Sequence, residues 1–353
     1  MNRQPKRILA VLSLRNEAAF LLDWLAHHRA VGFTDFLVLS NDCQDGTDAM
    51  LDRLEQLGWL THLPNDGPYD KGGIQFTGLK LADRHKLVKK ADWIMALDID
   101  EYVNIHVGDN TLSALLEALP QATAITLTWR LFGNAGIMRY RDQPVSETFT
   151  RCAPTVMYWP WRAAMFKTLY RNDGTYRKLG VHRPRSADKD RLDAAQWYDG
   201  EGRALEDQFK LTRIFNTYGR SNYKLAQLNH YALGAMESFV LKADRGRAVH
   251  SDHLLDMDYW VERNFNTESD TTIRQIAPRS APLREELRAD PELAQLHDAA
   301  VAWRKARFLH LMELEPFRAL FARLLMTPPS RPISLTSART LAGFANLGQI
   351  KHS

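Results

Sequence analysis

Short, almost wholly apolar segments alternate with amphipathic ones over the first 132 residues of the chain. The apolar segments, which predict strands, are residues 8–14, 36–40, 59–63, 93–97 and 124–129. Helical spacing predicts helices over 17–31, with Asn16 as N-cap and Gly32 as stop, from Asp45 or Thr47 to Gly58, and over 74–90. Because strands that alternate with helices form βαβ units, we expect an α/β fold, a Rossmann-like mixed sheet flanked by helices.

The pattern changes twice further along the chain. Residues 133–235 are rich in aromatic and basic side chains, which suits a binding lobe laid against the sheet or simply a packed region. From residue 236 helical spacing predominates, and we expect helices over 238–250, 253–264 and 291–326. The predicted organisation is a sheet domain over 1–235, a helical C-terminal region over 236–327 and a mobile tail over 328–353.

Two carboxylates follow the strand predicted at 93–97. If the chain stays extended there, Asp98 and Asp100 point to one side and Ile99 points into the core, because side chains alternate along a strand. Such a pair is favoured when a hard cation such as Mn²⁺ or Mg²⁺ lies between the oxygens. The alternative is a solvated strand end. An EF-hand loop is disfavoured, since the position that requires glycine is Val103.

Polar residues also follow other predicted strands. Arg15, Asn16 and Glu17 follow the first strand, and Asn41 and Asp42 follow the second. Ligands of open α/β sheets bind outside the carboxyl ends of the strands, so these side chains and the Asp98–Asp100 pair are expected to line one crevice. Free N–H groups at the helix start near Asn16 suit an anion or a polar base edge, although Asn16 can equally be only a cap.

A glycine-containing turn, Asp70-Lys-Gly-Gly73, precedes the helix predicted at 74–90. Glycine permits close approach of the backbone to a ligand. We expect Lys71 to offset the charge of a diphosphate and Gln75, in the first helical turn, to contact the same ligand. The alternative is a tight loop without a ligand.

Composition restricts the class of protein. The 353-residue chain is 45% hydrophobic and 25% charged, as globular proteins are, and its net charge of +4 is too small to favour nucleic acid as a partner. Two cysteines, Cys43 and Cys152, form neither a disulfide framework nor a four-cysteine zinc site. With no signal peptide and no apolar run of about 18–20 residues, we expect a cytoplasmic protein. Arginines among the apolar residues of 291–326 favour a helix that covers the core, or one that contacts the inner face of the membrane.

Taken together, several short motifs resemble bacterial glycosyltransferases of the family 2 type, in the branch related to family 92. The matching stretches are Leu14-Arg-Asn-Glu17 with Trp24 and His27-His28, Ser40-Asn-Asp-Cys-Gln-Asp-Gly-Thr47, Leu97-Asp-Ile-Asp-Glu-Tyr102, Trp129-x-x-Phe-Gly133, and Asn229-His-Tyr231 with Ser238, Phe239, Lys242, Arg245 and Gly246. The resemblance covers residues 8–247. It implies a GT-A fold, a nucleotide-sugar donor, a divalent metal and inversion at the anomeric carbon.

The resemblance also implies roles for single residues. Asp100 is the expected metal ligand, and Asp98 contacts the metal through water or the ribose. His182 and His230 are candidates to complete the coordination, and an imidazole ligand favours Mn²⁺ over Mg²⁺. Asn41 stands where the family usually has an acid, which leaves the nucleotide base open. Lys242, Arg245 and Arg247 share a helix face on which they could hold phosphate or the acceptor, or face solvent.

The expected reaction is transfer of a sugar from a nucleotide diphosphate donor, UDP-linked by preference, to a hydroxyl of a glycan or lipid-linked acceptor, as in polysaccharide biosynthesis. For the base that removes the acceptor proton the candidates are Glu206 and Asp207, with Asp142 in reserve. A metal-dependent nucleotidyltransferase is a second hypothesis, disfavoured because Ser13-Leu-Arg-Asn-Glu17 contains no glycine. A non-catalytic module that binds glycan or nucleotide is a third.

Overall fold

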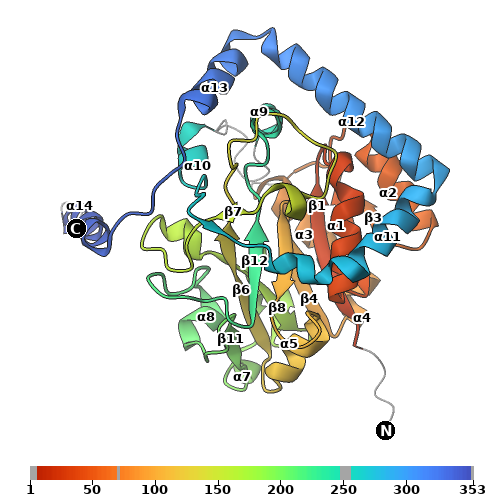
Figure 1. Ribbon diagram of the computed structural model, residues 1–353. Coiled ribbons are helices and arrows are strands. Elements are labelled where there is room, and N and C mark those ends of the chain that lie inside the picture. The colour runs from red at the N-terminus through yellow and green to blue at the C-terminus, as the bar shows by residue number, and fades with distance from the viewer. Residues whose placement is uncertain (1–5, 70–71, 247–255, 351–353) are drawn as a thin grey trace.

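A mixed sheet forms the centre of the computed structural model, which describes residues 6–69, 72–246 and 256–350 (Figure 1). The strand order is β3-β2-β1-β4-β8-β6-β12-β5, and β11 pairs with β6 beside this path. The strands are β1 Ile8–Leu14, β2 Asp35–Ser40, β3 Thr61–Pro64, β4 Trp93–Leu97, β5 Glu101–Ile105, β6 Ala124–Leu131, β8 Phe166–Arg171, β11 Trp197–Asp199 and β12 Ala226–His230. Two small ribbons pair β7 (Arg151–Cys152) with β13 (Glu268–Ser269) and β9 (Tyr176–Lys178) with β10 (Arg185–Ala187).

The predicted α/β fold is confirmed. Strands β1 to β4 pair in parallel, whereas β8 runs antiparallel to both β4 and β6. The strands predicted at 8–14 and 93–97 have the same bounds in the structure. Strand β5 was not predicted, because it begins at once after the carboxylate turn and its first residue, Glu101, is charged.

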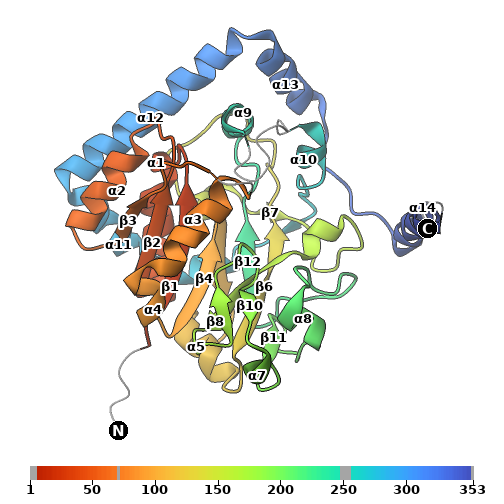
Figure 2. The same cartoon turned by 180° about the vertical axis from the view of Figure 1, so that it is seen from behind.

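Alternate residues of β1 face two different apolar layers. Ala10 and Leu12 belong to the layer beneath α1, and Leu9 and Val11 to the layer beneath α3. This two-sided burial explains why the strand reads as continuously apolar. Figure 1 is drawn from the side of α1 and α11, and Figure 2, turned by 180°, brings α3 and α4 to the front.

Helices cover both faces of the sheet and form the C-terminal region. They are α1 Ala18–Val31, α2 Thr47–Gln56, α3 Gly73–Arg84, α4 Lys86–Lys90, α5 Leu112–Ala118, α6 Val145–Thr148, α7 Lys189–Leu192, α8 Asp207–Leu211, α9 Met236–Arg245, α10 Met257–Val261, α11 Ala277–Ala289, α12 Pro291–Met312, α13 Glu315–Met326 and α14 Leu335–Ile350. Two 3₁₀ turns, Trp161–Ala164 and Thr272–Ile276, complete the set.

Several helix predictions need correction. The helices predicted over 238–250 and 253–264 are Met236–Arg245 and Met257–Val261 in the described residues. The N-cap of α1 is Glu17, not Asn16, because the N–H groups of Glu17 and Ala18 donate to the side chains of Thr47 and Asp45, each at 3.0 Å. The helix predicted over 74–90 is split at His85, whose backbone is extended. The helix predicted over 291–326 is also two helices, because Leu314 is extended ahead of Glu315 and the proline that follows.

The C-terminal helices lie over one end of the sheet and beyond it. Helix α12 runs along α1, α2 and α9, and α13 leads from it towards α10, whereas α14 stands apart from the body of the molecule in both views (Figures 1 and 2). Ser330 ties the connecting segment to the body, since its N–H donates to the carbonyl of Asn264 at 2.9 Å. No helix in the described part of the chain is both long and apolar enough to cross a membrane.

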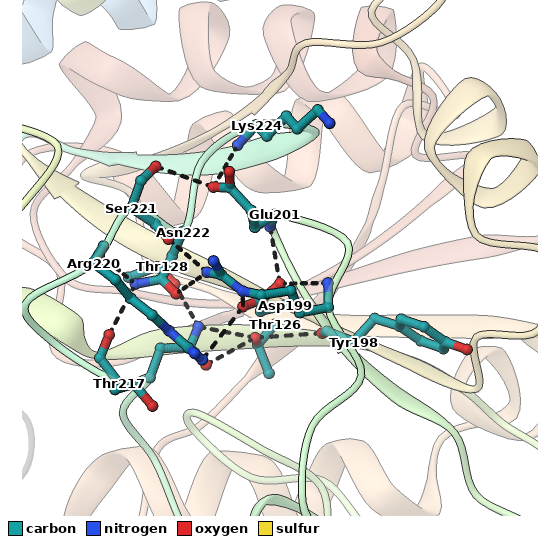
Figure 3. A network of polar contacts seen from close by, with 12 residues as sticks. Thr126, Thr128, Tyr198, Asp199, Glu201, Thr217, Arg220, Ser221, Asn222 and Lys224 are labelled. Atoms are coloured by element: carbon teal, nitrogen blue, oxygen red, sulfur yellow. Dashed lines mark hydrogen bonds and ion pairs between the residues drawn. The ribbon is translucent and has the colours of Figure 1, made fainter.

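A polar network fixes the segment that follows β11 (Figure 3). The fully buried carboxylate of Asp199 accepts hydrogen bonds from the Arg203 side chain at 2.9 Å and from the N–H of Glu201 at 3.1 Å. Glu201 in turn accepts from the Ser221 hydroxyl at 3.0 Å. Because β11 pairs with residues 124–126, the first residues of β6, this network lies towards the amino end of that strand.

Candidate active site

Asp98 and Asp100 lie in one tight turn at the carboxyl end of β4. The turn is closed by the N–H of Glu101, which donates to the carbonyl of Asp98 at 3.0 Å, and by the Glu101 carboxylate, which accepts from the N–H of Asp98 at 2.9 Å. The extended continuation expected from the sequence is therefore wrong. Even so, Ile99 packs against the core, and both aspartates face one cavity, as predicted.

That cavity, which we call the first cavity, has a volume of about 430 Å³. It lies outside the carboxyl ends of β1, β2 and β4, where ligands of open α/β sheets bind. The predicted site residues that line it are Arg15, Glu17, Asn41, Gln75, Asp98, Asp100, His182 and His230. Residues from six separate segments of the sequence are thus brought together.

Two lysines neutralise the aspartates. Lys167 in β8 donates to Asp98 at 2.8 Å and Lys242 in α9 donates to Asp100 at 2.6 Å. Burial opposes the charge on each group, but Lys242 and His230 hold the pKa of Asp100 well below its usual range, and Asp100 in turn raises the pKa of Lys242. Each aspartate is therefore paired with a lysine in this arrangement, and Asp100 is held in its charged form.

A third acid, Glu101, lies under the turn with no exposed surface. Its Oε1 accepts a hydrogen bond from the Trp129 indole at 2.6 Å, and its Oε2 is 3.5 Å from Lys167. Burial, together with Asp98 and Asp100, raises the pKa of Glu101 to about 8, although Lys167 lowers it. Glu101 thus acts from behind the cavity, by holding the turn and Trp129 in place.

Both predicted histidines face the first cavity as neutral rings. The Nδ1–H of His182 donates to the carbonyl of Phe166 at 3.0 Å, which leaves its Nε2 with a free lone pair. Burial and Lys167 lower the pKa of His182 to about 4. His230 stacks against Trp129, with 4.1 Å between ring centroids, and its Nε2 lies 3.8 Å from Asp100. Burial also lowers the pKa of His230.

Glu17 and Arg245 close the side of the cavity next to α1. The Arg245 guanidinium contacts the Glu17 carboxylate and donates to the carbonyl of Arg15 at 2.7 Å. The Arg15 guanidinium reaches the carbonyl of Arg245 at 3.4 Å. On α9, therefore, Lys242 and Arg245 line the cavity rather than forming a solvated helix face, and their contact with phosphate or acceptor stays a prediction.

Several predicted residues lie elsewhere. Asn16 has a positive φ of 55° and accepts from the N–H of Gln44 at 2.6 Å, which places it away from the first cavity. Asp42 is exposed and accepts from the Tyr69 hydroxyl at 3.1 Å. Lys71 and Arg247 lie outside the described residues.

The three acids proposed as the base do not reach the first cavity either. Glu206 occupies the N-cap position of α8, and Asp207, with 85% of its side chain exposed, pairs with Lys210 at 2.8 Å. Both follow β11, which pairs with the start of β6, whereas the cavity lies at the carboxyl ends of the strands. Asp142 pairs with His297 at 2.9 Å and Arg288 at 3.0 Å beside α12.

The donor groups fit a divalent cation in kind. Two carboxylates and two neutral imidazoles line the first cavity, and the buried Nδ1 of His230 has no hydrogen-bond partner in the described structure. However, Lys167 and Lys242 each hold an aspartate oxygen, and within residues 6–69, 72–246 and 256–350 no three His, Cys, Asp or Glu side chains converge as metal ligands. A cation and the two lysines would therefore compete for the same carboxylates.

Sequence reasoning missed some members of the site. It placed Lys167 only in a basic region, yet this side chain is 1% exposed and pairs with Asp98. The sequence feature that could have identified Lys167 is its position inside an otherwise apolar strand, Phe-Lys-Thr-Leu-Tyr. A lysine at such a position is expected to pair with a buried anion. The lining also includes aromatic and cationic residues that were not proposed as site residues, among them Trp129, Arg162, Tyr259 and Arg263.

Comparison with known sequences gives a family. Residues 9–265 match the sequence profile of glycosyltransferase family 92. A glycosyltransferase family 92 protein of Oryza sativa subsp. japonica is 21% identical over 153 residues, which are 42% of this chain and 25% of the rice protein. The chain thus spans about a quarter of the length of this curated relative.

Solved structures show only distant likeness. S. aureus TarS 1–349 has a TM-score of 0.32 and 12% identity, covering 85% of this chain and 92% of that one. The same protein in complex with UDP-GlcNAc gives 0.32 and 15%, covering 88% and 73%. Glucosyl-3-phosphoglycerate synthase from Mycobacterium tuberculosis, in complex with Mn²⁺, UDP and glucosyl-3-phosphoglycerate, gives 0.27 and 14%, covering 48% and 58%. The family assignment therefore depends on the sequence profile alone.

Proposed function

The chain belongs to glycosyltransferase family 92, and from this premise we propose that it moves a sugar from a nucleotide diphosphate donor, a UDP-sugar by preference, to a hydroxyl acceptor in the first cavity. The observation that carries this proposal is the cavity itself. It combines the carboxylates of Asp98 and Asp100 with a set of cationic side chains, namely Arg15, Arg162, Lys242, Arg245 and Arg263. Such a site suits a ligand with two linked phosphates.

Different residues of the first cavity are suited to bind different parts of the donor. The amides of Asn41 and Gln75 can hydrogen-bond the nucleoside, and Arg15 and Arg245 lie where they can hold the diphosphate. Gln75 also donates to Asp98 at 3.4 Å, which links the helix start of α3 to the carboxylate turn. The arrangement orients the donor before reaction.

We propose that Asp98, Asp100, His182 and His230 hold a divalent cation, Mn²⁺ or Mg²⁺. When bound, the cation supplies positive charge to the leaving diphosphate. For this, Lys242 has to leave Asp100, and its ammonium then becomes available to a phosphate oxygen. Lys167, buried behind Asp98, stays as a fixed counter-charge.

The chemical step forms a bond between the acceptor oxygen and the anomeric carbon while the bond from that carbon to the diphosphate oxygen breaks. In-line attack inverts the carbon, as we propose here. The acceptor proton passes to a carboxylate on the wall of the cavity, for which Glu17 and Asp100 are the candidates. The low pKa of Asp100 makes it a weak base. Loss of the base should slow transfer by about 10²–10⁴-fold while donor binding persists. Variants of Glu17 and Asp100 therefore show which of the two carboxylates is the base.

Donor screening tests the proposed function. The protein is incubated with Mn²⁺ and a panel of UDP- and GDP-sugars, and release of the nucleoside diphosphate is followed. Turnover of at least one sugar nucleotide is expected. Release of pyrophosphate from a nucleoside triphosphate would instead favour a nucleotidyltransferase, and binding without turnover would favour a non-catalytic module.

We also propose that the C-terminal helices contact an anionic membrane, which would bring the enzyme to a lipid-linked acceptor. Residues 316–353 contain no aspartate or glutamate, whereas Arg318, Arg323, Arg331 and Arg339 are basic. Apolar side chains remain exposed on the same helices, with Met326 74% and Phe344 63% exposed. Basic residues together with exposed apolar residues match an anionic lipid surface.

A further inference from the structure

A second cavity lies on the other side of the wall formed by the catalytic carboxylates. Five residues line both cavities: Glu17, Ile99, Asp100, Lys242 and Arg245. The rest of the second cavity is formed by α1, the loop at 139–149, the start of α9, and α12. A molecule in the second cavity would therefore meet the donor site across Asp100 and Glu17.

The lining of the second cavity combines aromatic and cationic side chains. Phe20, Phe149, Tyr231 and Trp303 supply flat apolar surfaces of the kind on which sugar rings pack. Arg139, Arg141 and Arg304 add positive charge. This composition suits a sugar or polyol that also carries an anionic group.

Arg304 is the most informative of these residues, because it is a buried cation with no carboxylate in direct contact. The Glu17 carboxylate acts on it only from beyond ion-pair distance and is itself paired with Arg245. Its residue is 5% exposed, and its guanidinium lies against the rings of Phe20 and Tyr140, 4.5 and 4.9 Å from their centroids, while the two rings pack edge to face. One hydrogen bond, to the Ser238 hydroxyl at 3.0 Å, is present, and the buried Nε has no partner among the described residues.

Neighbouring arginines show what is missing at Arg304. Arg307, one turn further along α12, pairs with Asp244 at 2.9 Å, and Arg288 at the end of α11 pairs with Asp142 at 3.0 Å. Within the described chain no carboxylate lies within ion-pair distance of Arg304. A buried charge is unfavourable without a counter-ion, and a guanidinium binds carboxylate or phosphate in a fixed fork.

We propose that the second cavity is the acceptor site and that Arg304 binds a carboxylate or phosphate group of the acceptor. The acceptor class is thus an anionic sugar or polyol, whose hydroxyl reaches the shared wall while its anionic group lies at α12. This inference deepens the proposed function and rests on it. It also gives Phe20 and Tyr140 a role, since the guanidinium packs against both of their rings.

The test compares three sugars with the same ring: methyl glucoside, methyl glucuronide and methyl glucoside 6-phosphate. Binding to the full-length protein in the presence of UDP and Mn²⁺ is measured by isothermal titration calorimetry. We expect at least one anionic sugar to bind about tenfold more tightly than methyl glucoside. The carboxylate and phosphate arms then distinguish the two anionic groups.

Two variants make the test specific. Arg304→Met keeps the length of the side chain and removes its charge, so it should abolish the preference for the anionic sugar. Lys305→Met removes an exposed charge from the next position of α12 and should keep the preference. Thermal unfolding is measured to check that both variants are folded. A folded state is expected for Arg304→Met, because the substitution removes a buried charge that has no ion pair.

The outcomes separate this inference from the proposed function. If no UDP-sugar is bound or turned over by the unmodified protein, the proposed function fails. If UDP-sugar is turned over but the three methyl sugars bind equally, or Arg304→Met retains the anionic preference, the acceptor assignment is overturned. A loss of UDP affinity in Arg304→Met, equal to the loss for the anionic sugar, would assign Arg304 to the donor and also overturn it.

Discussion

Lys242 donates a hydrogen bond of 2.6 Å to Asp100, a residue 142 positions earlier in the chain. The contact connects α9, the first helix of the C-terminal region, to the turn after β4. The Lys242 ammonium, which could bind a phosphate group, therefore occupies the Asp100 carboxylate, which could bind a metal ion. Release of Lys242 from Asp100 is therefore the event on which the proposed use of the site depends.

Asp100→Asn is expected to reduce donor turnover by about 10²-fold or more. The amide oxygen can still accept from Lys242, so the fold should persist, whereas the charge that would hold a cation is lost. Release of nucleoside diphosphate and thermal unfolding are measured together. The double variant Glu206→Gln/Asp207→Asn, which changes two acids outside the first cavity, is the control and should keep its activity. Full activity of Asp100→Asn would remove Asp100 from the mechanism.

Metal removal should abolish turnover, and Mn²⁺ should restore it. His182→Ala and His230→Ala are expected to raise the Mn²⁺ concentration needed for half-maximal activity, for a true ligand by at least the about 10–100-fold that loss of a ligand's hydrogen-bond partner costs. His310→Ala, which changes an exposed histidine on α12, is the control. Unchanged activity in EDTA would show instead that Lys242 and the arginines of the first cavity neutralise the diphosphate without a metal.

Lys242→Met should strengthen Mn²⁺ binding although it weakens catalysis. Without Lys242 nothing has to be displaced from Asp100, and roughly tenfold tighter binding corresponds to about 1.4 kcal/mol. Electron paramagnetic resonance of free Mn²⁺ measures this without any turnover. Weaker Mn²⁺ binding in the variant would mean that Lys242 supports the metal site rather than competing for it.

The sequence predicted the fold well where local pattern and tertiary burial agree. The residues of β1 and β4 are apolar because both sheet faces are covered, so their bounds could be predicted. Helix α11 was missed, because Pro282 lies inside it and proline indicates the end of a helix. The C-terminal tail, predicted to be mobile, contains α14, and its mobility stays a prediction.

The site was predictable to the extent that topology determines it. Arg15, Asn41 and Asp98 each follow a parallel strand, so their convergence follows from the sheet. The partners Lys167 and Lys242 come from an antiparallel strand and from a helix far along the chain, and no local spacing relates them to the aspartates. Glu206 and Asp207 were chosen by sequence order, which does not show that β11 pairs at the amino end of β6.

Stability is expected to fall as the pH decreases below about 6.5, because of His27 and His28. Both rings are buried between α1 and β5, where His27 Nε2 lies 2.8 Å from the carbonyl of Val103 and His28 Nε2 accepts from the N–H of Val103 at 3.3 Å. Burial lowers the pKa of both histidines. The unfolded chain therefore binds protons more readily, and the stability present above pH 6.5 is lost as the pH falls.

Urea unfolding midpoints at pH 7.5, 6.5 and 5.5 measure this dependence. His28→Gln, which keeps a hydrogen-bonding side chain without a titrating ring, should give a shallower decline than the unmodified protein, even if its stability at pH 7.5 is lower. Equal slopes for the two proteins would show that His28 does not titrate on unfolding. His27 and His28 would then contribute to the packing of α1 against β5 but not to the pH dependence of stability.

Binding to membranes should depend on α14 and on lipid charge. We expect the protein to sediment with vesicles that contain phosphatidylglycerol, more weakly with phosphatidylcholine alone, and less at high salt, because screening weakens attraction to anionic lipid. Leu341→Asp/Phe344→Asp changes two exposed apolar residues of α14 and should abolish binding. Leu57→Asp, at a residue of the body that is as exposed as Leu341, should not. If the α14 variant instead dissociates a dimer and the unmodified protein ignores lipid charge, then these helices are an interface between two copies of the chain.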